Sequence, residues 1–270
     1  AQTLGEAQDG LRSIMEDKIF GASGNQVVIE EFLTGPEVSV LCFTDGKTIV
    51  PMVSSMDHKR ARDGDEGPNT GGMGTLAPNP FYTAEVAQEC MRTIFLPTVE
   101  AMKEEGRPFK GCLYFGLMLT PDGPKVIEYN CRFGDPETQV VLSLLESDLL
   151  EIMSAVTDGR LSQADVRFSG EAAACVVLAS GGYPGKYETG KEISGLEGSF
   201  EEGVAVYHAG TALREGKTVT SGGRVLGVTA RAASLQKAVE KAYAAAEKIH
   251  FSGKQWRTDI GRRALNALRK

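Results

Sequence analysis

Two oxygen-bearing side chains lie two residues apart in the string K-V-I-E-Y-N-C-R-F-G-D-P-E of residues 125–137. Side chains at i and i+2 of a strand point to the same face, so Glu128 and Asn130 share one face while Ile127 and Tyr129 pack on the other. A carboxylate and an amide carbonyl are hard oxygen donors that Mg²⁺ takes, with phosphates and water completing its shell. The spacing predicts a metal site, although an ordinary solvated strand face has the same pattern.

The same string runs on into a predicted helix. Gly134 turns the chain, and Asp135 and Pro136 supply the N-cap and the favoured first-turn proline of a helix that extends to about Glu146. The positive end of this helix would lie close to the metal ligands, where anions are stabilised. The alternative is that Asp135 is a helix cap and nothing more.

A central strand is predicted next to the metal ligands. Residues Gly111–Thr120 are apolar on both faces, as in a strand buried within a sheet. The turn Pro121–Pro124 makes this strand the antiparallel neighbour of the strand that carries Glu128. We therefore expect the face with the oxygen donors to lie at the centre of a sheet.

Further strands are predicted upstream. Val27–Leu33 has the composition of a buried strand that runs into a connector. Glu37–Phe43 and Thr48–Val53 flank the turn signal Asp45-Gly46 and predict an antiparallel hairpin.

Residues 54–80 have little hydrophobic pattern and predict a loop of about 25 residues, which in a compact domain is uncommon unless it is functional or disordered. Its glycine-rich end, residues 69–74, resembles turns whose backbone N–H groups approach an anion. A merely flexible loop is the alternative. The clustered bases Lys59, Arg60 and Arg62 favour an anionic ligand, because the protein as a whole is acidic.

A helix is predicted over residues 3–18, and the turn at residues 20–25 ends it. A second helix is predicted after Thr83, where apolar positions recur at helical spacing. Past residue 168 a strand at 172–179, several short strands and an alanine-rich helix at 235–249 indicate a small α+β module. The predicted organisation is therefore α+β throughout, with one domain at 1–168 and a second at 169–270.

The composition is that of a globular protein. The 270 residues carry a net charge of −7, which does not favour non-specific binding to nucleic acid or anionic membranes. There is no signal-peptide pattern or apolar run long enough for a membrane span, so a cytoplasmic location is expected. Five cysteines without a C-x-x-C pair predict reduced thiols, and three scattered histidines give no zinc signature.

Six strings in order carry a family resemblance: V-V-I-E-E-F-L-x-G-x-E, D-H-K-R, N-T-G-G-M-G, G-x-L-Y-F-G-L-M-L, V-I-E-Y-N-C-R-F-G-D-P-E-T-Q and A-S-G-G-Y-P-G. Together they resemble the phosphoribosylamine-glycine ligases of the ATP-grasp superfamily, and the resemblance spans essentially the whole chain. It implies an ATP-grasp core of antiparallel sheet and helices, followed by the small C-terminal domain.

The resemblance also implies a role for each matching residue. The ATP-binding set would be Glu30, Glu31, Phe32 and Leu33 of the connector, Glu37 on the ribose hydroxyls, and Lys59. Glu31 as a solvated strand end and Glu37 as a cross-strand partner are the open alternatives. Glu128 and Asn130 would hold Mg²⁺ or Mn²⁺, and Arg132 and Asp135 would act at the reacting groups. The substrate-binding set would be Asn69, Thr70, Gly71, Gly72, Met73, Gly74 and Glu137.

The implied reaction joins glycine to 5-phosphoribosylamine with ATP hydrolysis, through a glycyl phosphate, in purine biosynthesis. Such chemistry needs charge neutralisation and positioning and not a protein nucleophile. Because the family's N-terminal domain and first ATP-grasp strands would precede Ala1, we expect a fragment without full turnover by itself. The alternatives are a nucleotide-binding module without catalysis and another ATP-grasp ligase that joins a carboxylate to an amine.

Overall fold

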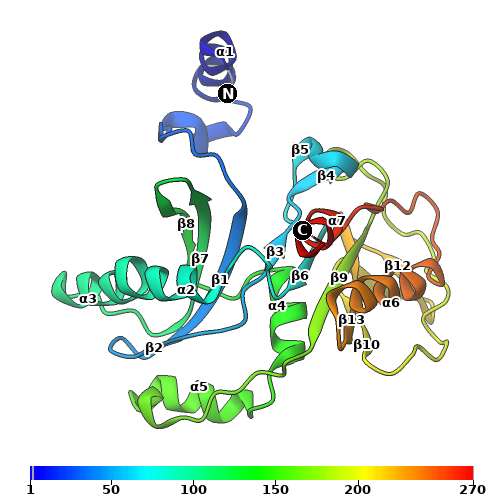
Figure 1. Cartoon of the computed structure of the whole chain (residues 1–270). Coiled ribbons are helices and arrows are strands. Elements are labelled where there is room, and N and C mark those ends of the chain that lie inside the picture. Colours follow the sequence, from blue (N-terminus) through cyan, green and yellow to red (C-terminus); the bar gives the residue numbers. More distant parts are fainter. Residues whose placement is uncertain (2, 270) are drawn as a thin grey trace. The chain divides into compact units, whose positions relative to one another are not determined.

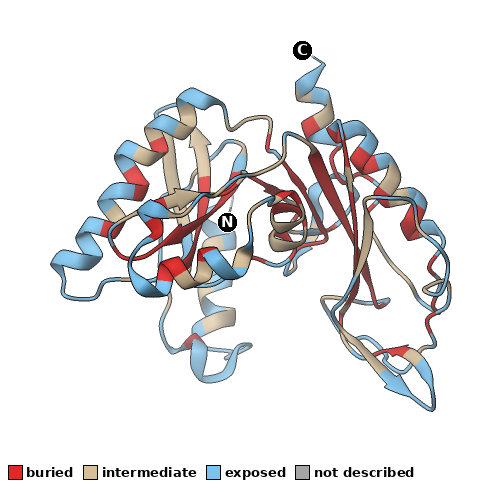
Figure 2. Ribbon diagram, turned by 90° about the horizontal axis from the view of Figure 1, so that it is seen from below, coloured by how far each residue is buried: buried red, intermediate tan, exposed pale blue. Residues whose placement is uncertain are grey.

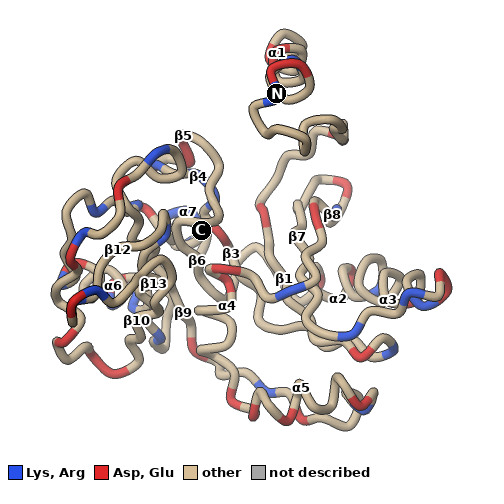
Figure 3. Tube along the Cα trace, turned by 180° about the vertical axis from the view of Figure 1, so that it is seen from behind, with Lys and Arg blue, Asp and Glu red and all other residues tan. Residues whose placement is uncertain are grey.

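The computed structural model describes residues 1 and 3–269, and the chain divides into two compact units, Ala1–Thr34 and Gly35–Lys270 (Figure 1). Helices and strands both contribute to the second unit, so the predicted α+β class is confirmed. Acidic and basic residues are interspersed along both units (Figure 3). Among the described residues, no helix is long and apolar enough to cross a membrane.

The first unit contains one α-helix, α1 (Leu4–Met15), and a short 3-10 helix, η1 (Gly21–Asn25). Thr3 caps α1, because its Oγ1 accepts a hydrogen bond from the Glu6 amide at 3.2 Å. The predicted helix over residues 3–18 and the turn that ends it are confirmed.

The strand predicted at Val27–Leu33 is wrong. Residues 26–34 form no ladder with any residue that the structure describes, and the Val28 and Ile29 side chains are 81% and 82% exposed. A strand is held by hydrogen bonds to a neighbour, and a run of β-branched residues does not supply that neighbour.

A four-stranded antiparallel sheet begins the second unit, with the strand order β2-β1-β7-β8. Its strands are β1 (Glu37–Thr44), β2 (Ile49–Pro51), β7 (Gly111–Thr120) and β8 (Gly123–Asn130). The hairpin of β1 and β2 is confirmed, and its turn is held by Asp45 Oδ1, which accepts from the Lys47 and Thr48 amides at 3.0 and 2.7 Å. β7 is internal as predicted, but β8 pairs with β7 alone and lies at the edge, so the expected central place of the oxygen donors is wrong.

Strand alternation gives this sheet two buried faces. Val40 and Phe115 pack under the helical stretch formed by α2 (Ala84–Cys90), the π-helical turn η3 (Met91–Phe95) and α3 (Leu96–Glu104). Phe43 and Tyr114 point to the opposite face, where they pack with α5 (Leu149–Asp158). Figure 2 shows the buried strands between these helical layers.

The helix after Asp135 is shorter than predicted. It consists of α4 (Glu137–Val141) and the 3-10 turn η4 (Leu142–Leu144), and Pro136, joined to Asp135 by a cis peptide bond, occupies the N-cap. Asp135 Oδ1 accepts from Gln139 Nε2 at 3.0 Å and lies 3.4 Å from Arg224 Nη1. The predicted N-cap role of Asp135 and first-turn role of Pro136 are wrong, because other side chains engage that carboxylate.

A five-stranded antiparallel sheet has the order β10-β13-β9-β6-β3. Its strands are β3 (Met56–Asp57), β6 (Gly74–Ala77), β9 (Ala172–Ala179), β10 (Val204–His208) and β13 (Arg224–Ala232). Every residue of β9 is buried: Val176 and Leu178 pack with α6 (Leu235–Glu247), while Cys175 packs on the opposite face with Val140 of α4. The predicted strand at 172–179 and the alanine-rich helix are confirmed (Figure 1).

The loop predicted over residues 54–80 contains regular structure, so this prediction is wrong. Besides β3 and β6, it holds a hairpin of β4 (Arg60–Arg62) and β5 (Glu66–Asn69) with the 3-10 turn η2 (Asp63–Asp65) between them. The partner of β6 is β9, which lies far along the chain. Local periodicity does not show a pairing of this kind.

The remaining elements of the second unit are short. They are the 3-10 turn η5 (Leu161–Gln163), the hairpin of β11 (Thr211–Arg214) and β12 (Lys217–Thr220), and the helix α7 (Arg262–Leu268).

The thiols of Cys42, Cys90, Cys112 and Cys175 are free and buried, as predicted for core cysteines, whereas Cys131 is exposed.

Candidate functional site

A polar cavity of about 300 Å³ lies where the end of β8 meets the segment around β3, β4 and β5. It brings together many of the residues singled out from the sequence. Its lining consists of Asp57, Lys59, Asn69, Thr70, Gly71, Tyr114, Glu128, Asn130, Arg132, Gly134, Asp135 and Glu137.

Glu128 and Asn130 both line the cavity, so the predicted common face of the two oxygen donors is confirmed. In the ladder between β7 and β8, Glu128 lies opposite Gly116 and Asn130 opposite Tyr114. A Cβ atom at Gly116 would lie 2.9 Å from the Glu128 Cγ. Glycine at this position therefore leaves room for the Glu128 side chain.

Lys59 connects two acidic residues of the site. Its Nζ lies 3.4 Å from Glu128 Oε1 and 3.7 Å from Glu37 Oε2, and its side chain is 30% exposed. Burial by itself would lower the pKa of the Lys59 ammonium, but the carboxylates of Glu37, Glu128 and Asp57 raise it above its ordinary value. A fixed positive charge next to the oxygen donors suits an anionic ligand such as a phosphate.

Two further carboxylates, Asp57 and Glu137, lie in the cavity. Burial, and then the charge of Glu137, raise the pKa of Asp57 well above its usual range. Burial likewise raises the pKa of Glu137, which is 4% exposed and accepts a hydrogen bond from Ser39 Oγ at 3.3 Å. Each of these two carboxyl groups therefore resists ionisation more than an isolated carboxyl group does.

Tyr114 extends this network from β7. Its hydroxyl lies 2.8 Å from Ser39 Oγ, and burial raises the pKa of the phenol. The network therefore presents a neutral hydroxyl and two carboxyl groups on one wall, while Lys59 and Arg132 present positive charge on the same cavity. Arg132 Nη1 also donates to its neighbour's carbonyl, that of Phe133, at 2.8 Å.

The glycine-rich segment contributes part of its length. Asn69, Thr70 and Gly71 line the cavity, whereas Met73 is fully buried and Gly74 packs within β6. The Gly71 amide donates to Tyr183 Oη at 3.0 Å and the Gly72 amide to Thr70 Oγ1 at 3.0 Å. These amides stabilise the loop itself.

Gly72 is required at its position by close packing. Its φ is +111°, and a Cβ atom would lie 2.5 Å from Pro136 Cδ and 2.7 Å from Asp57 Oδ1. Glycine here lets the loop approach the turn that follows β8.

Four predicted ATP-binding residues lie outside the second unit. Glu30, Glu31, Phe32 and Leu33 belong to the first unit, Ala1–Thr34, and their role stays a prediction. Glu37, at the start of β1, contacts the site through Lys59.

Sequence reasoning missed several residues of the site. Asp57 is the first residue of the D-H-K-R string, and Tyr114 lies on the strand predicted next to β8, so both had a usable signal. Arg224 had none, because it lies in β13. Its Nη1 donates to the carbonyls of Gly71 and Asp135 at 2.6 and 2.8 Å, which joins two walls of the cavity.

The donor chemistry fits a divalent metal. Glu128 and Asn130 present two oxygen donors to the cavity, and Mg²⁺ is usually bound through one or two carboxylates together with substrate phosphates and water. Among the described residues, no group of three His, Cys, Asp or Glu side chains forms an all-protein metal site. The cavity suits a metal that arrives with a phosphate ligand.

The overall fold recurs in solved structures. The phosphoribosylamine–glycine ligase of Thermotoga maritima superposes with a TM-score of 0.81 at 39% identity, over 94% of this chain and 62% of that one. The biotin carboxylase domain of the 2-oxoglutarate carboxylase from Hydrogenobacter thermophilus gives a TM-score of 0.68 at 16% identity, over 93% of this chain and 53% of that one. The class defined by this fold and cavity is that of the ATP-grasp proteins.

Residues 1–138 match the phosphoribosylglycinamide synthetase, ATP-grasp (A) domain, and residues 173–263 match the C domain of the same synthetase. The chain belongs to the phosphoribosylglycinamide synthetase family, which confirms the resemblance seen in the sequence. The phosphoribosylamine–glycine ligase of Rhodopirellula baltica is 51% identical over 97% of this chain. The trifunctional purine biosynthetic protein adenosine-3 of Gallus gallus is 52% identical over 97% of it. The chain spans 61% of the first relative's length and 26% of the second's.

Proposed function

We propose that the protein catalyses the ATP-dependent ligation of glycine to 5-phosphoribosylamine, which gives glycinamide ribonucleotide, ADP and phosphate in purine biosynthesis. The observation that carries the proposal is the single cavity in which Glu128, Asn130, Lys59 and Arg132 converge, in a chain of the synthetase family. The names of the relatives support the choice of glycine and the ribosylamine.

In the proposed first step, an oxygen of the glycine carboxylate attacks the γ-phosphorus of ATP, glycyl phosphate forms and ADP leaves. Glu128 and Asn130 would hold Mg²⁺ or Mn²⁺, which neutralises charge on the phosphates. Lys59 lies beside Glu128 and adds positive charge at the phosphates, and Arg132 attracts the anionic substrate groups.

In the proposed second step, the amino nitrogen of 5-phosphoribosylamine attacks the acyl carbon, the carbon–nitrogen bond forms and inorganic phosphate leaves. The nitrogen loses a proton in this step. The carboxyl pair of Asp57 and Glu137 lies in the same cavity and would accept it, because burial raises both pKa values and makes the pair a better base than an ordinary carboxylate. Asn69, Thr70 and Gly71 form the wall on which the substrate would rest.

The proposal has further parts. The connector Glu30–Leu33 and Glu37 would bind adenine and ribose, in keeping with their match to the family. A domain boundary near residue 168 is supported by the two family matches, which stop at 138 and resume at 173. A cytoplasmic location is proposed from the names of the relatives, which are those of biosynthetic enzymes.

The test is a turnover assay on the full-length protein with ATP, glycine, 5-phosphoribosylamine and Mg²⁺, in which glycinamide ribonucleotide and phosphate are both measured. We expect the two products in equal amounts, and no product when glycine is replaced by bicarbonate or when the metal is chelated. Equal turnover with bicarbonate would favour a carboxylase-type reaction. Nucleotide binding without any ligation product would favour the non-catalytic alternative.

A further inference from the structure

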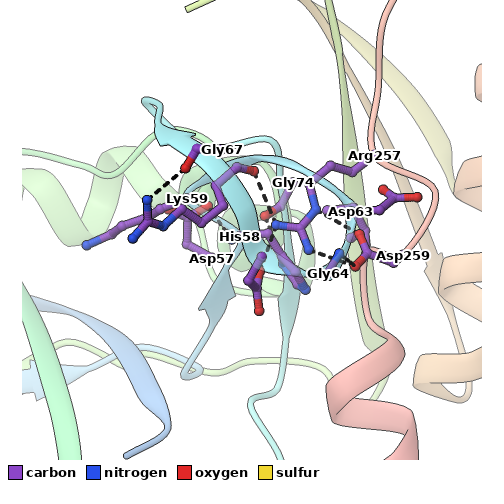
Figure 4. Close-up of polar contacts among 12 residues, drawn as sticks. Asp57, His58, Lys59, Asp63, Gly64, Gly67, Gly74, Arg257 and Asp259 are labelled. Atoms are coloured by element: carbon purple, nitrogen blue, oxygen red, sulfur yellow. Dashed lines mark hydrogen bonds and ion pairs between the residues drawn. The ribbon is translucent and has the colours of Figure 1, made fainter. Parts of the chain in front are cut away.

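The residues around Lys59 are held from a distant part of the chain. Residues 257–261, which lie between α6 and α7, contact the hairpin of β4 and β5 across nearly 200 positions of sequence, as the pair Gly64 and Asp259 shows. Figure 4 shows these contacts beside Asp57 and Lys59. The cavity wall thus depends on a segment that contributes no lining residue of its own.

Arg257 is the centre of these contacts, and its side chain is 1% exposed. Nε and Nη2 donate to the two carboxylate oxygens of Asp259 at 2.7 and 2.9 Å. Nη1 donates to Asp65 Oδ1 at 2.8 Å and to the Arg60 carbonyl at 3.2 Å. The guanidinium therefore connects its own segment to the end of η2 and to the start of β4, and the Arg60 carbonyl lies one residue from Lys59.

Asp259 and Asp63 complete what we call the Arg257 cluster, which comprises Asp63, Asp65, Arg257 and Asp259. Asp259 Oδ2 accepts from the Gly64 amide at 2.8 Å, and Asp63 Oδ1 accepts from the Thr258 amide at 2.8 Å. The hairpin and the C-terminal segment are thus joined in both directions by charge-assisted hydrogen bonds.

His58 adds a second attachment next to Lys59. Its Nδ1 lies 3.2 Å from the Gly74 carbonyl, and its Nε2 accepts from the Gly261 amide at 3.2 Å, which fixes a neutral imidazole with the proton on Nδ1. The His58 amide donates to Asp57 Oδ1 at 2.7 Å. His58 thereby orients both of its neighbours, which line the cavity.

The glycine-rich part of the cavity wall is attached to Lys59. The Thr70 amide and Thr70 Oγ1 donate to the Lys59 carbonyl at 2.7 and 2.8 Å. These bonds attach Thr70, at the middle of the lining segment Asn69–Gly71, to Lys59. A buried ion pair generally adds little net stability over apolar packing, but it fixes geometry. The Arg257 cluster accordingly has a role in geometry that packing alone would not supply.

We propose that Arg257 is a positioning residue: through Asp65 and the Arg60 carbonyl it holds Lys59 at the distance from Glu128 that nucleotide binding requires. The C-terminal module is thereby part of the binding machinery. This inference rests on the proposed function, because it assigns Lys59 to the nucleotide phosphates.

The test is a double-mutant cycle on the affinity for ATP with Mg²⁺, measured by calorimetry on the full-length protein. The first variants are Asp65→Asn, whose side chain is 57% exposed so that folding is retained, and Arg257→Lys, which keeps the charge but loses the two-pronged contact with Asp259. Each is combined with Lys59→Met. Arg231→Met is the matched control, because Arg231 also bonds a distant carbonyl, that of Ser143, away from the cavity.

We expect Asp65→Asn and Arg257→Lys each to weaken ATP binding about fivefold when Lys59 is present and by less than about 1.5-fold in the Lys59→Met background. Arg231→Met should leave the affinity unchanged. Equal losses in both backgrounds would mean that Arg257 acts through general stability, and unchanged affinity in folded variants would equally overturn the inference. If the wild-type protein binds no ATP, the proposed function fails and the inference fails with it; wild-type binding with unaffected variants overturns the inference alone.

Discussion

The segment of residues 57–74 contributes side chains both to the cavity and to the Arg257 cluster. Both regions combine carboxylates with a basic residue, but the pKa values of their carboxylates are shifted in opposite directions. In the cavity, burial raises the pKa values of Asp57 and Glu137, and the charge of Glu137 raises that of Asp57 further. In the cluster, burial of Asp259 would raise its pKa, but Arg257 outweighs this effect and lowers the pKa to about 2. The charge of Asp259 is compensated by Arg257, whereas the charges of Asp57 and Glu137 are not fully compensated by groups of the protein.

The carboxylates of the two regions have different partners. In the Arg257 cluster, Asp65 and Asp259 are paired with Arg257, while Asp63 and Asp259 accept from the backbone amides of Thr258 and Gly64. The cavity holds several acids around Lys59, an arrangement that a metal and phosphates would complete. Substitutions in the cluster should therefore cost stability as well as nucleotide affinity, and substitutions in the cavity should cost activity with little loss of stability.

The largest expected effect is on activity. Glu128→Gln removes the carboxylate charge from the proposed metal site, and we expect ligation turnover to fall by about 10²–10³-fold. The melting temperature should stay within about 2 °C of the wild-type value, since Glu128 is exposed. Glu151→Gln, an exposed acid on α5, is the control and should be fully active. Retained turnover in Glu128→Gln would contradict the assignment.

Arg257→Met tests the other side of the comparison. It leaves the buried carboxylate of Asp259 without its cation, so the free energy of unfolding should fall by about 3–5 kcal/mol in urea titrations. Arg231→Met, at a half-exposed arginine, should cost less than about 1 kcal/mol. A similar small loss for Arg257→Met would show that the cluster is not structural.

His58 should make the fold sensitive to acid. Burial, and then the charge of Arg257, lower the pKa of His58 to about 4, below the ordinary value of about 6.5. The folded state therefore favours the neutral ring, and this contribution is present above pH 6.5 and is lost as the pH falls towards 4. On the order of 3 kcal/mol is expected. The pH dependence of unfolding should be shallower in His58→Gln over this range, and an unchanged slope would argue against the buried neutral imidazole.

Asp57→Asn should have the smallest effect, and it should be favourable. Because the folded-state pKa of Asp57 is raised, its contribution to stability is complete at acid pH and is lost as the pH rises through that pKa. The variant lacks this loss and keeps an acceptor for the His58 amide. We expect it to be more stable than the wild type at alkaline pH, with the difference disappearing at acid pH. Lower stability at pH 8 would contradict the account of the cavity.

The sequence predicted the elements whose signals are local. Alternation placed Glu128 and Asn130 on one face, the continuous apolar run of β7 identified an internal strand, and the Asp45 turn identified a hairpin. The composition of Val27–Leu33 predicts a strand, although no described strand pairs with it.

The missed parts depend on long-range contacts. The pairing of β6 with β9 and the bonds of Arg224 to Gly71 and Asp135 join residues far apart in sequence, and neither leaves a periodic pattern. The helix cap at Asp135 failed for the same reason, since Arg224 lies next to that carboxylate.

The measurement that tests the central claim most directly is the affinity for ATP with and without Mg²⁺, in the wild-type protein and in Glu128→Ala and Asn130→Ala. If these two residues hold the metal beside the phosphates, Mg²⁺ should tighten ATP binding in the wild type by about tenfold or more, and each substitution should remove that gain. Binding of ATP that needs no divalent metal and survives both substitutions would contradict the claim.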